Sequence, residues 1–141
     1  MAEALADEQA TLTLGAELAQ RLQPGSLVFL HGDLGAGKTT LVRGILRAFG
    51  HSGSVKSPTY TLLEPYETSF GSVLHFDFYR IGDPQELEFI GIDELMDSSA
   101  IKFVEWPERA VGQMPEPDVD IFLNVVGSGR EVSVCWHVNE V

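Results

Sequence analysis

Cysteine, basic side chains and long apolar runs are all scarce in this sequence of 141 residues. The single cysteine, Cys135, excludes an internal disulfide framework and a metal site built from several cysteines. No apolar run approaches the roughly 20 residues that a membrane-spanning helix needs. Residues 1–8 carry acids but none of the basic side chains that begin a signal peptide. We therefore expect a cytoplasmic location and no membrane association.

Lysine and arginine number only 9 against 21 aspartates and glutamates, which gives a net charge of −12. Proteins that grip nucleic acid unaided need clustered basic side chains, so this composition argues against direct binding of nucleic acid. The charge is also uneven. Residues 31–56 hold four bases and one acid, whereas residues 83–120 hold eleven acids and two bases. The first segment offers a positive field to an anion, and the second is either a solvated face or a docking surface for a basic partner.

Residues 32–39 have the clearest chemical meaning. They read Gly-Asp-Leu-Gly-Ala-Gly-Lys-Thr and fit the phosphate-loop pattern G-x-x-x-x-G-K-[ST] at every fixed position. A strand-like run, 27–31, precedes the loop, and Leu41, Ile45 and Leu46 follow it at helical spacing. Glycines let backbone N–H groups converge on a phosphate, and the start of a helix adds partial positive charge there. This combination predicts a bound nucleoside triphosphate.

Within this loop, each position has an expected task. Lys38 can reach the β- and γ-phosphates, and the Thr39 hydroxyl can ligate Mg²⁺. We therefore predict ATP and Mg²⁺ as the cofactors. The predicted nucleotide-binding residues are Asp33, Leu34, Gly35, Ala36, Gly37, Lys38, Thr39 and Thr40.

The remaining patterns, together with an apolar fraction of 44%, indicate one globular domain spanning residues 1–141. The predicted helices cover residues 8–22, capped by Asp7, then 38–49, and 84–91, capped by Asp83, with single turns near 93–96 and 107–110. The predicted strands are 27–31, 60–66, 72–78, 101–105, 119–126 and 131–138. Hairpins and a strand–helix unit in one chain require a mixed sheet. The predicted fold class is α/β, a P-loop NTPase-like domain with a mixed β-sheet flanked by helices. Cys135, in the last strand, is expected to be a small core residue.

Carboxylates end two of the predicted strands. Asp77 closes the apolar run 73–77, and Glu105 closes 101–105. Because strand ends of open α/β sheets gather at the rim where ligands bind, both belong with the phosphate loop. Asp77 is the candidate partner of Mg²⁺, or else an aspartate that caps a turn. Glu105 is placed to orient or deprotonate a water, to hold Mg²⁺ through water, or to form a rim salt bridge, for instance with Arg80.

Other polar and aromatic residues remain open between two roles. Thr59, in Ser-Pro-Thr at 57–59, is either a switch-loop hydroxyl near the γ-phosphate or part of a turn. Arg80 is a charge stabiliser or a structural ion-pair partner. His75 shares a sheet face with Asp77 and is expected to be a hydrogen-bonded core histidine rather than a ligand. Trp106 either belongs to the core or stacks near the site.

Taken together and in order, five segments resemble the TsaE (YjeE) family. They are residues 32–40, 55–60, 75–80, 86–91 and 104–108. The phosphate loop is common to many families. The pattern H-x-D-x-Y-R followed by V-E-W-P is much more specific.

This resemblance, which runs from about Asp7 to Arg130, implies a small bacterial ATPase required to form threonylcarbamoyladenosine in tRNA. It implies two partners, the transferase TsaD and its paralogue TsaB. The resemblance also implies that ATP hydrolysis supports the turnover of their complex, and that the chain meets tRNA only through these partners. The oligomeric state stays open. The site residues that the family motifs imply are Lys38 and Thr39 for phosphate and Mg²⁺, Thr59 in the first switch, Asp77 for the metal, Glu105 for hydrolysis, and Trp106 in the same motif.

Two other functions fit a phosphate loop. A small-metabolite kinase usually needs a lid of arginines, and after Arg80 only Arg109 and Arg130 occur, scattered along the chain. A nucleotide-gated binding module with vestigial hydrolysis is the second alternative. A GTPase is disfavoured because no N-K-x-D or T-K-x-D motif follows the loop. An ATPase this small is expected to be slow until a partner completes its site.

Overall fold

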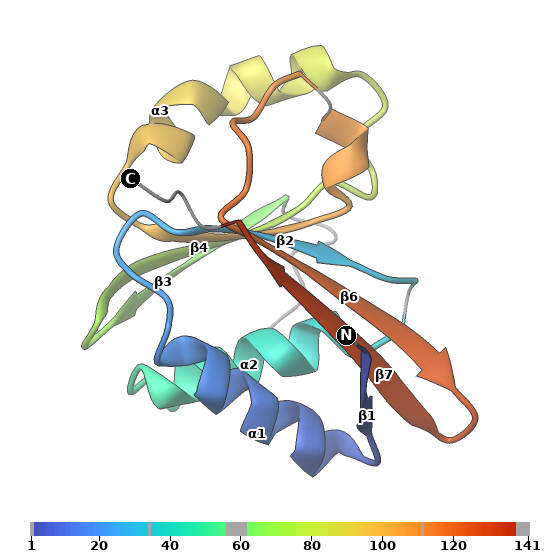
Figure 1. Ribbon diagram of the computed structural model, residues 1–141. Helices are drawn as coiled ribbons and strands as arrows, with labels where there is room; N and C mark the ends of the chain where they lie inside the picture. Colours follow the sequence, from blue (N-terminus) through green and yellow to red (C-terminus); the bar gives the residue numbers. More distant parts are fainter. Residues whose placement is uncertain (1, 34, 56–61, 111, 138–141) are drawn as a thin grey trace.

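The computed structural model describes residues 2–33, 35–55, 62–110 and 112–137 (Figure 1). The described residues form one seven-stranded sheet in the order β1-β7-β6-β2-β5-β4-β3. The strands are β1 Ala2–Leu5, β2 Leu27–His31, β3 Leu63–Thr68, β4 Gly71–Asp77, β5 Ile101–Glu105, β6 Val119–Val126 and β7 Gly129–Trp136.

The centre of the sheet is parallel and its edges are antiparallel. Strand β2 lies parallel to both β5 and β6, and β4 lies parallel to β5. The pairs β3–β4, β6–β7 and β1–β7 are antiparallel. A mixed sheet in an α/β fold is therefore confirmed. Strand β5 is buried along its whole length, as expected for a parallel strand covered on both faces.

Helices cover both faces of the sheet. The helices α1 (Glu8–Ala19) and α2 (Lys38–Ala48) lie side by side on one face (Figure 1). On the other face lie the 3-10 helix η1 (Pro84–Ile90), the short helix α3 (Ile92–Asp97) and the 3-10 turn η2 (Pro107–Ala110). Each layer has its own apolar cluster against the sheet. Within the described ranges, no helix is long and apolar enough to cross a membrane.

Two glycines let α1 and α2 approach closely. A Cβ added at Gly15 would lie 2.8 Å from the Leu41 carbonyl oxygen, and one at Gly44 would lie 2.7 Å from the Leu12 carbonyl oxygen. Real Cβ atoms essentially never come that near to backbone. The two helices are consequently in backbone contact where Gly15 faces Leu41 and Gly44 faces Leu12.

Most predicted elements are confirmed, with informative exceptions. Asp7 caps α1 by accepting a hydrogen bond from the Ala10 N–H at 2.9 Å, but the helix ends at Ala19 rather than at residue 22. The helix expected after Asp83 is a 3-10 helix. Strand β3 begins at Leu63, and the first residues predicted for it lie outside the described ranges.

Two expectations about the sheet were incomplete or wrong. Strand β1 was not predicted, because Ala-Glu-Ala-Leu has no strand signature and becomes a strand by pairing with β7. The prediction that Cys135 is a core residue is wrong, because Cys135 is exposed. Its neighbours Val132 and Val134 pack on the core beneath α1. Alternation along a strand therefore turns Cys135 to the opposite, solvent-facing side.

Candidate active site

The phosphate loop joins the end of β2 to the start of α2, as predicted. Gly35 and Gly37 take φ values of 82° and 104°, in the left-handed region that side-chain-bearing residues rarely adopt. Gly37 also stands at the N-cap of α2, so the unpaired N–H groups of the first helical turn face the loop. This arrangement makes the loop an anion-binding cradle.

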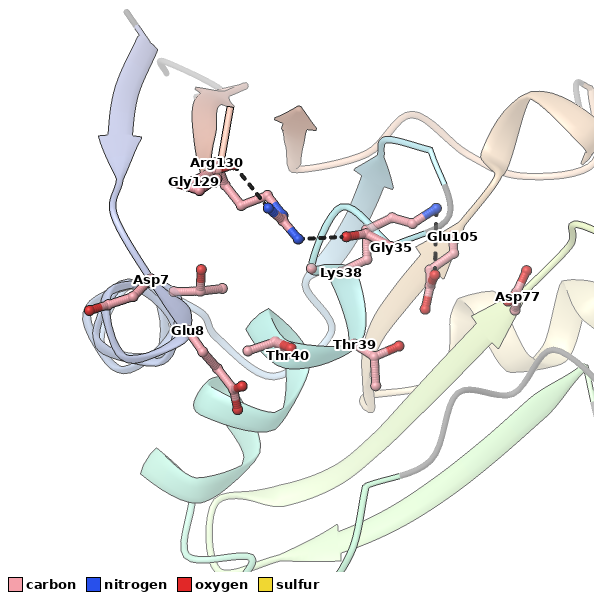
Figure 2. Close-up of a pocket in the computed structure, with 13 residues that line it drawn as sticks. Asp7, Glu8, Gly35, Lys38, Thr39, Thr40, Asp77, Glu105, Gly129 and Arg130 are labelled. Atoms are coloured by element: carbon pink, nitrogen blue, oxygen red, sulfur yellow. Dashed lines mark hydrogen bonds and ion pairs between the residues drawn. The ribbon is translucent and has the colours of Figure 1, made fainter. Parts of the chain in front are cut away.

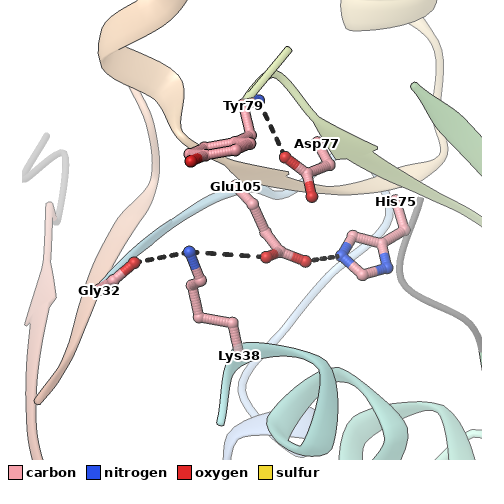
Figure 3. Close-up of polar contacts among 6 residues, drawn as sticks. All are labelled: Gly32, Lys38, His75, Asp77, Tyr79 and Glu105. Carbon is pink, nitrogen blue, oxygen red and sulfur yellow. Dashed lines mark hydrogen bonds and ion pairs between the residues drawn. The ribbon is translucent and has the colours of Figure 1, made fainter. Parts of the chain in front are cut away.

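Lys38, the first residue of α2, is buried among polar and aromatic partners. Its Nζ donates a hydrogen bond of 2.6 Å to the Gly32 carbonyl and lies 3.6 Å from Oε1 of Glu105 (Figure 3). The same ammonium lies 4.5 Å from the ring centroid of Trp106. Lys38 is 5% exposed and Glu105 is 3% exposed. Two buried opposite charges thus compensate each other at the floor of the loop.

Glu105 is held from its other side by His75. The His75 Nε2 and Glu105 Oε2 lie 2.6 Å apart, and His75 is completely buried (Figure 3). When a glutamate is ionised its oxygens only accept hydrogen bonds, and Nε2 is then the donor of this pair. His75 Nδ1 has no hydrogen-bond partner among the described residues. The expectation of a hydrogen-bonded core histidine is confirmed.

Asp77 lies beside Glu105 on the same rim. The two residues are paired across the parallel strands β4 and β5. Asp77 is 2% exposed, and its Oδ1 accepts a hydrogen bond from the Tyr79 N–H at 2.9 Å. The side chain therefore caps the turn after β4 and also borders the cavity described next.

A cavity of about 430 Å³ joins these groups (Figure 2). Of the predicted site residues, those that line it are Gly35, Gly37, Lys38, Thr39, Thr40, Asp77 and Glu105. Ala36 is buried in the loop at 1% exposure, and Asp33 is an exposed loop residue that does not line the cavity. Leu34 and Thr59 lie outside the described ranges.

The cavity also contains residues that the sequence patterns left out of the site. They are Asp7, Glu8 and Thr11 of the α1 region and Ser128, Gly129 and Arg130 of the β6–β7 turn. Arg130 donates from Nη2 to the Gly35 carbonyl at 3.1 Å, so it is not remote from the loop. Its place depends on the pairing of Leu5 with Arg130 across β1 and β7, and the sequence carries no local signal for that pairing.

Two carboxylates and a hydroxyl on this cavity could hold a divalent cation. Thr39, Asp77 and Glu105 supply hard oxygen atoms. In the described part of the chain, no group of three or more His, Cys, Asp and Glu side chains could hold a metal alone. Mg²⁺ usually takes one or two carboxylates and completes its shell with water and substrate phosphates. The residues therefore fit a Mg²⁺ that arrives with a nucleotide.

The parallel strand, the glycine loop and the helix that starts at Lys38 define a P-loop nucleotide-binding protein. The model of one family, described as "Threonylcarbamoyl adenosine biosynthesis protein TsaE", matches residues 5–132. The chain belongs to the TsaE family.

Known relatives support the same assignment. A tRNA threonylcarbamoyladenosine biosynthesis protein TsaE from Haemophilus influenzae is 41% identical over 138 residues, covering 94% of this chain and 87% of the relative. A TsaE from Rickettsia felis is 36% identical, with 91% and 75% covered. Among solved structures, Bacillus subtilis YdiB superposes with a TM-score of 0.79 at 26% identity, covering 94% of this chain and 82% of YdiB. The family resemblance and the α/β fold class inferred from the sequence are both confirmed.

Proposed function

We propose that this chain, acting as one domain, binds ATP with Mg²⁺ and hydrolyses it slowly to ADP and phosphate. In this proposal a complex of TsaD and TsaB accelerates hydrolysis, and the hydrolysis supports threonylcarbamoyl transfer to adenosine in tRNA in the cytoplasm. The observation that carries the proposal is that Lys38 and Thr39 of the phosphate loop line the same cavity as Asp77 and Glu105. The two partners are part of the proposal and rest on what the resemblance to the TsaE family implies.

The residues divide the chemistry between them. Lys38 and the N–H groups of the loop would bind the phosphates, while Thr39 and Asp77 would hold Mg²⁺, with Glu105 as a further oxygen donor. Bound there, Mg²⁺ would neutralise charge on the transferred phosphoryl group. Glu105 would orient the attacking water or take its proton. Thr59 is proposed from its motif to act from the first switch.

The contacts of Glu105 offer a reason for slow intrinsic turnover. Its two oxygens lie 3.6 Å from Lys38 Nζ and 2.6 Å from His75 Nε2, so both face groups other than a water. Phosphate oxygens that take over Lys38 would release one side of the carboxylate. A partner that completes the site could then raise the rate by about 10³–10⁵, as stabilisers supplied in trans do.

These same contacts favour one alternative, a nucleotide-gated binding module. If Glu105 stays bound to Lys38 and His75 with nucleotide present, ATP occupancy alone would control partner binding, and hydrolysis would be vestigial.

The test is to measure ATP hydrolysis by the purified chain alone and with a TsaB–TsaD complex, while scoring threonylcarbamoylation of tRNA. Weak hydrolysis that rises with the complex, together with multi-turnover modification, is the expected result. Binding of ATP without stimulated hydrolysis, but with modification intact, would favour the gated module. No effect on either hydrolysis or modification would overturn the proposal, and a screen for metabolite-kinase activity would follow.

A further inference from the structure

His75 is a buried polar side chain to which the proposed function assigns no task. It lies in the second half of β4 and has no exposed surface. Val73 and Phe76 of the same strand are equally buried, and the interior of a sheet normally takes apolar side chains of this kind. A histidine in such a place costs free energy unless its ring nitrogens find hydrogen-bond partners. Its contacts should therefore show why a histidine stands there.

One ring nitrogen of His75 is paired and the other is not. Nε2 lies 2.6 Å from Oε2 of Glu105, whereas Nδ1 is buried and has no hydrogen-bond partner among the described residues. An unpaired buried nitrogen lowers the stability of the fold. A histidine that served only the hydrogen bonding of the core would be expected to satisfy both nitrogens. The imidazole ring is thus oriented by a single bond, the one to Glu105.

This contact joins two neighbouring strands of the sheet. In the parallel register of β4 and β5, His75 lies opposite Phe103, and Asp77 lies opposite Glu105. His75 therefore reaches Glu105 on the diagonal, a spacing that long side chains can span. Strand β5 is buried along its whole length. Functional groups carried by such strands keep their positions more closely than groups carried by loops.

The two oxygens of Glu105 have partners of unequal strength. Figure 3 shows Lys38 and His75 on opposite sides of the carboxylate. Lys38 Nζ is 3.6 Å from Oε1, which is long for a charged hydrogen bond, while His75 Nε2 is only 2.6 Å from Oε2. Lys38 lines the cavity and His75 does not. A ligand in the cavity would therefore compete for Lys38 and leave the His75 contact in place.

We propose that His75 is a positioning residue, which holds the Glu105 carboxylate toward the attacking water through the contact at Oε2. This inference rests on the proposed ATP hydrolysis. Once phosphates take over Lys38, Oε1 is free to accept a hydrogen bond from the water, while Oε2 remains on Nε2. Without His75, the freed carboxylate would rotate, and the geometry needed for attack would be less populated. His75 acts only through Glu105 and contacts neither the nucleotide nor the water.

The test compares His75→Asn with His75→Gln. Glutamine can place its amide N–H near the position of Nε2, whereas asparagine is one methylene shorter and cannot reach Glu105. Calorimetry measures the affinity for Mg²⁺–ATP, and phosphate release with the TsaB–TsaD complex at saturating ATP measures kcat. We expect His75→Asn to keep the ATP affinity within about twofold and to lower kcat about 10–100-fold. His75→Gln should recover part of that loss.

Val73→Ala is the control for a general loosening of β4. Val73 is fully buried at the other end of the strand, opposite Ile101 and away from the cavity. Its truncation should lower the midpoint of thermal unfolding and leave kcat unchanged. If the histidine were merely structural, its variants would behave like Val73→Ala, with a lower unfolding midpoint and an unchanged kcat. That result would overturn the inference.

A double-mutant cycle tests whether His75 acts through Glu105. Adding His75→Asn to Glu105→Gln should lower kcat by no more than about twofold, because the group that His75 positions is already missing. A loss of the same size in both backgrounds would overturn the inference. So would equal losses in His75→Asn and His75→Gln, because the bond to Oε2 would then not matter.

The remaining outcomes are also decisive. If His75→Asn does not fold, His75→Leu replaces it, since leucine fills the space of the ring without a donor, and the same results are required. Weaker ATP binding with an unchanged kcat would overturn the inference, because His75 would then serve the nucleotide. A wild-type chain whose hydrolysis the complex does not raise would overturn the proposed function itself. That failure is seen before any variant is compared.

Discussion

Lys38 and Glu105 are almost wholly buried, and each is the other's charged neighbour. Removing a charge from water costs several kcal/mol, so either side chain alone would be unfavourable at the floor of the loop. The distance of 3.6 Å between them is longer than a good charged hydrogen bond. Their pairing therefore compensates the charges and can still give way to a more highly charged anion. The phosphates of a nucleotide would be such an anion.

Removing the cation tests the phosphate end of the site. Lys38→Ala is expected to weaken ATP binding at least about tenfold, because it deletes the counter-charge of the β- and γ-phosphates. Calorimetric titration with Mg²⁺–ATP measures the change, with Arg47→Ala as the charge-matched control and thermal unfolding to verify the fold. An affinity unchanged in a folded variant would dismiss the phosphate-loop assignment.

Neutralising the carboxylate separates binding from turnover. Glu105→Gln keeps an oxygen that accepts from His75 Nε2 but removes the negative charge. ATP binding should be retained, and partner-stimulated hydrolysis should fall about 10²–10⁴-fold, the usual contribution of a general base. Nucleotide binding and release of phosphate are measured side by side. A variant that lost binding but kept its turnover at saturating ATP would show that Glu105 serves affinity and not catalysis.

Among the elements, the α1–α2 pair depends on the absence of a side chain at Gly15 and Gly44. Gly44→Ala would place a Cβ 2.7 Å from the Leu12 carbonyl oxygen and 3.0 Å from its Cα. Overpacking of this kind costs about 1–3 kcal/mol, and the better helix propensity of alanine returns only about 1 kcal/mol. We expect a net loss of about 1 kcal/mol in the free energy of unfolding.

Urea unfolding measures this loss, and Gly82→Ala is the matched control. A Cβ at Gly82 would meet only the tip of Glu86, at 3.9 Å, so stability should change little. Equal stability of the Gly44→Ala variant and the wild type would mean that the two helices can move apart without cost.

Strand β5 carries a buried lysine that anchors α3. Lys102 is 1% exposed, and its Nζ donates to the carbonyls of Met96 and Ser98 at 3.0 and 2.8 Å. Burial lowers the pKa of Lys102 below 10.5, although Asp118 and Asp97 oppose the shift. Between the lowered pKa and 10.5, the unfolded chain binds more protons than the folded chain, so this group makes stability rise with pH.

The comparison that isolates this effect is between the wild type and Lys102→Met. The difference in unfolding free energy should shift in favour of the wild type as pH rises from neutral toward 10.5. Denaturant unfolding at several pH values measures it. A difference independent of pH across that window would show that Lys102 keeps its ordinary pKa in the folded protein.

Prediction from the sequence succeeded where the signal is local. The phosphate loop, the cap at Asp7 and the strand ending at Glu105 are all encoded within a few neighbouring residues. The place of Arg130 in the cavity is not encoded locally, because it depends on the pairing of β1 with β7 across more than a hundred residues of chain. The prediction that Cys135 is a core residue failed for a related reason. Alternation along a strand predicts that the strand has two faces, but it does not predict that one face of β7 meets solvent. Sequence patterns thus identified about half of the residues that line the cavity.

For the molecule as a whole, the excess of acid is concentrated on one layer. The exposed acids of η1 and α3, here named the acidic face, are Glu86, Glu88, Asp93, Glu94 and Asp97. A surface of one sign accelerates and strengthens association with a surface of the opposite sign. Under the proposed function, the acidic face would meet a basic part of the TsaB–TsaD complex, and this partner would hold the tRNA.

Salt dependence tests this arrangement. Association with the TsaB–TsaD complex should weaken between about 0.1 M and about 1 M salt, as the screening length falls from about 10 Å to about 3 Å. The double variant Glu88→Lys with Glu94→Lys should bind more weakly and lose most of that dependence. Glu17→Lys, an exposed acid on α1, is the control. Association equally strong for all variants would place the contact elsewhere on the molecule.

The strand order also bears on the sequence of events during synthesis. The phosphate loop leaves the ribosome early, yet one neighbour of β2 is β6, and β1 pairs with β7 at the edge of the described sheet. A nascent chain that stops before residue 119 would possess the loop and its helix but not residues 128–130, which also line the cavity. The lining of the cavity is therefore complete only after the last two strands have emerged. One cavity thus joins side chains from the earliest and the latest parts of the chain.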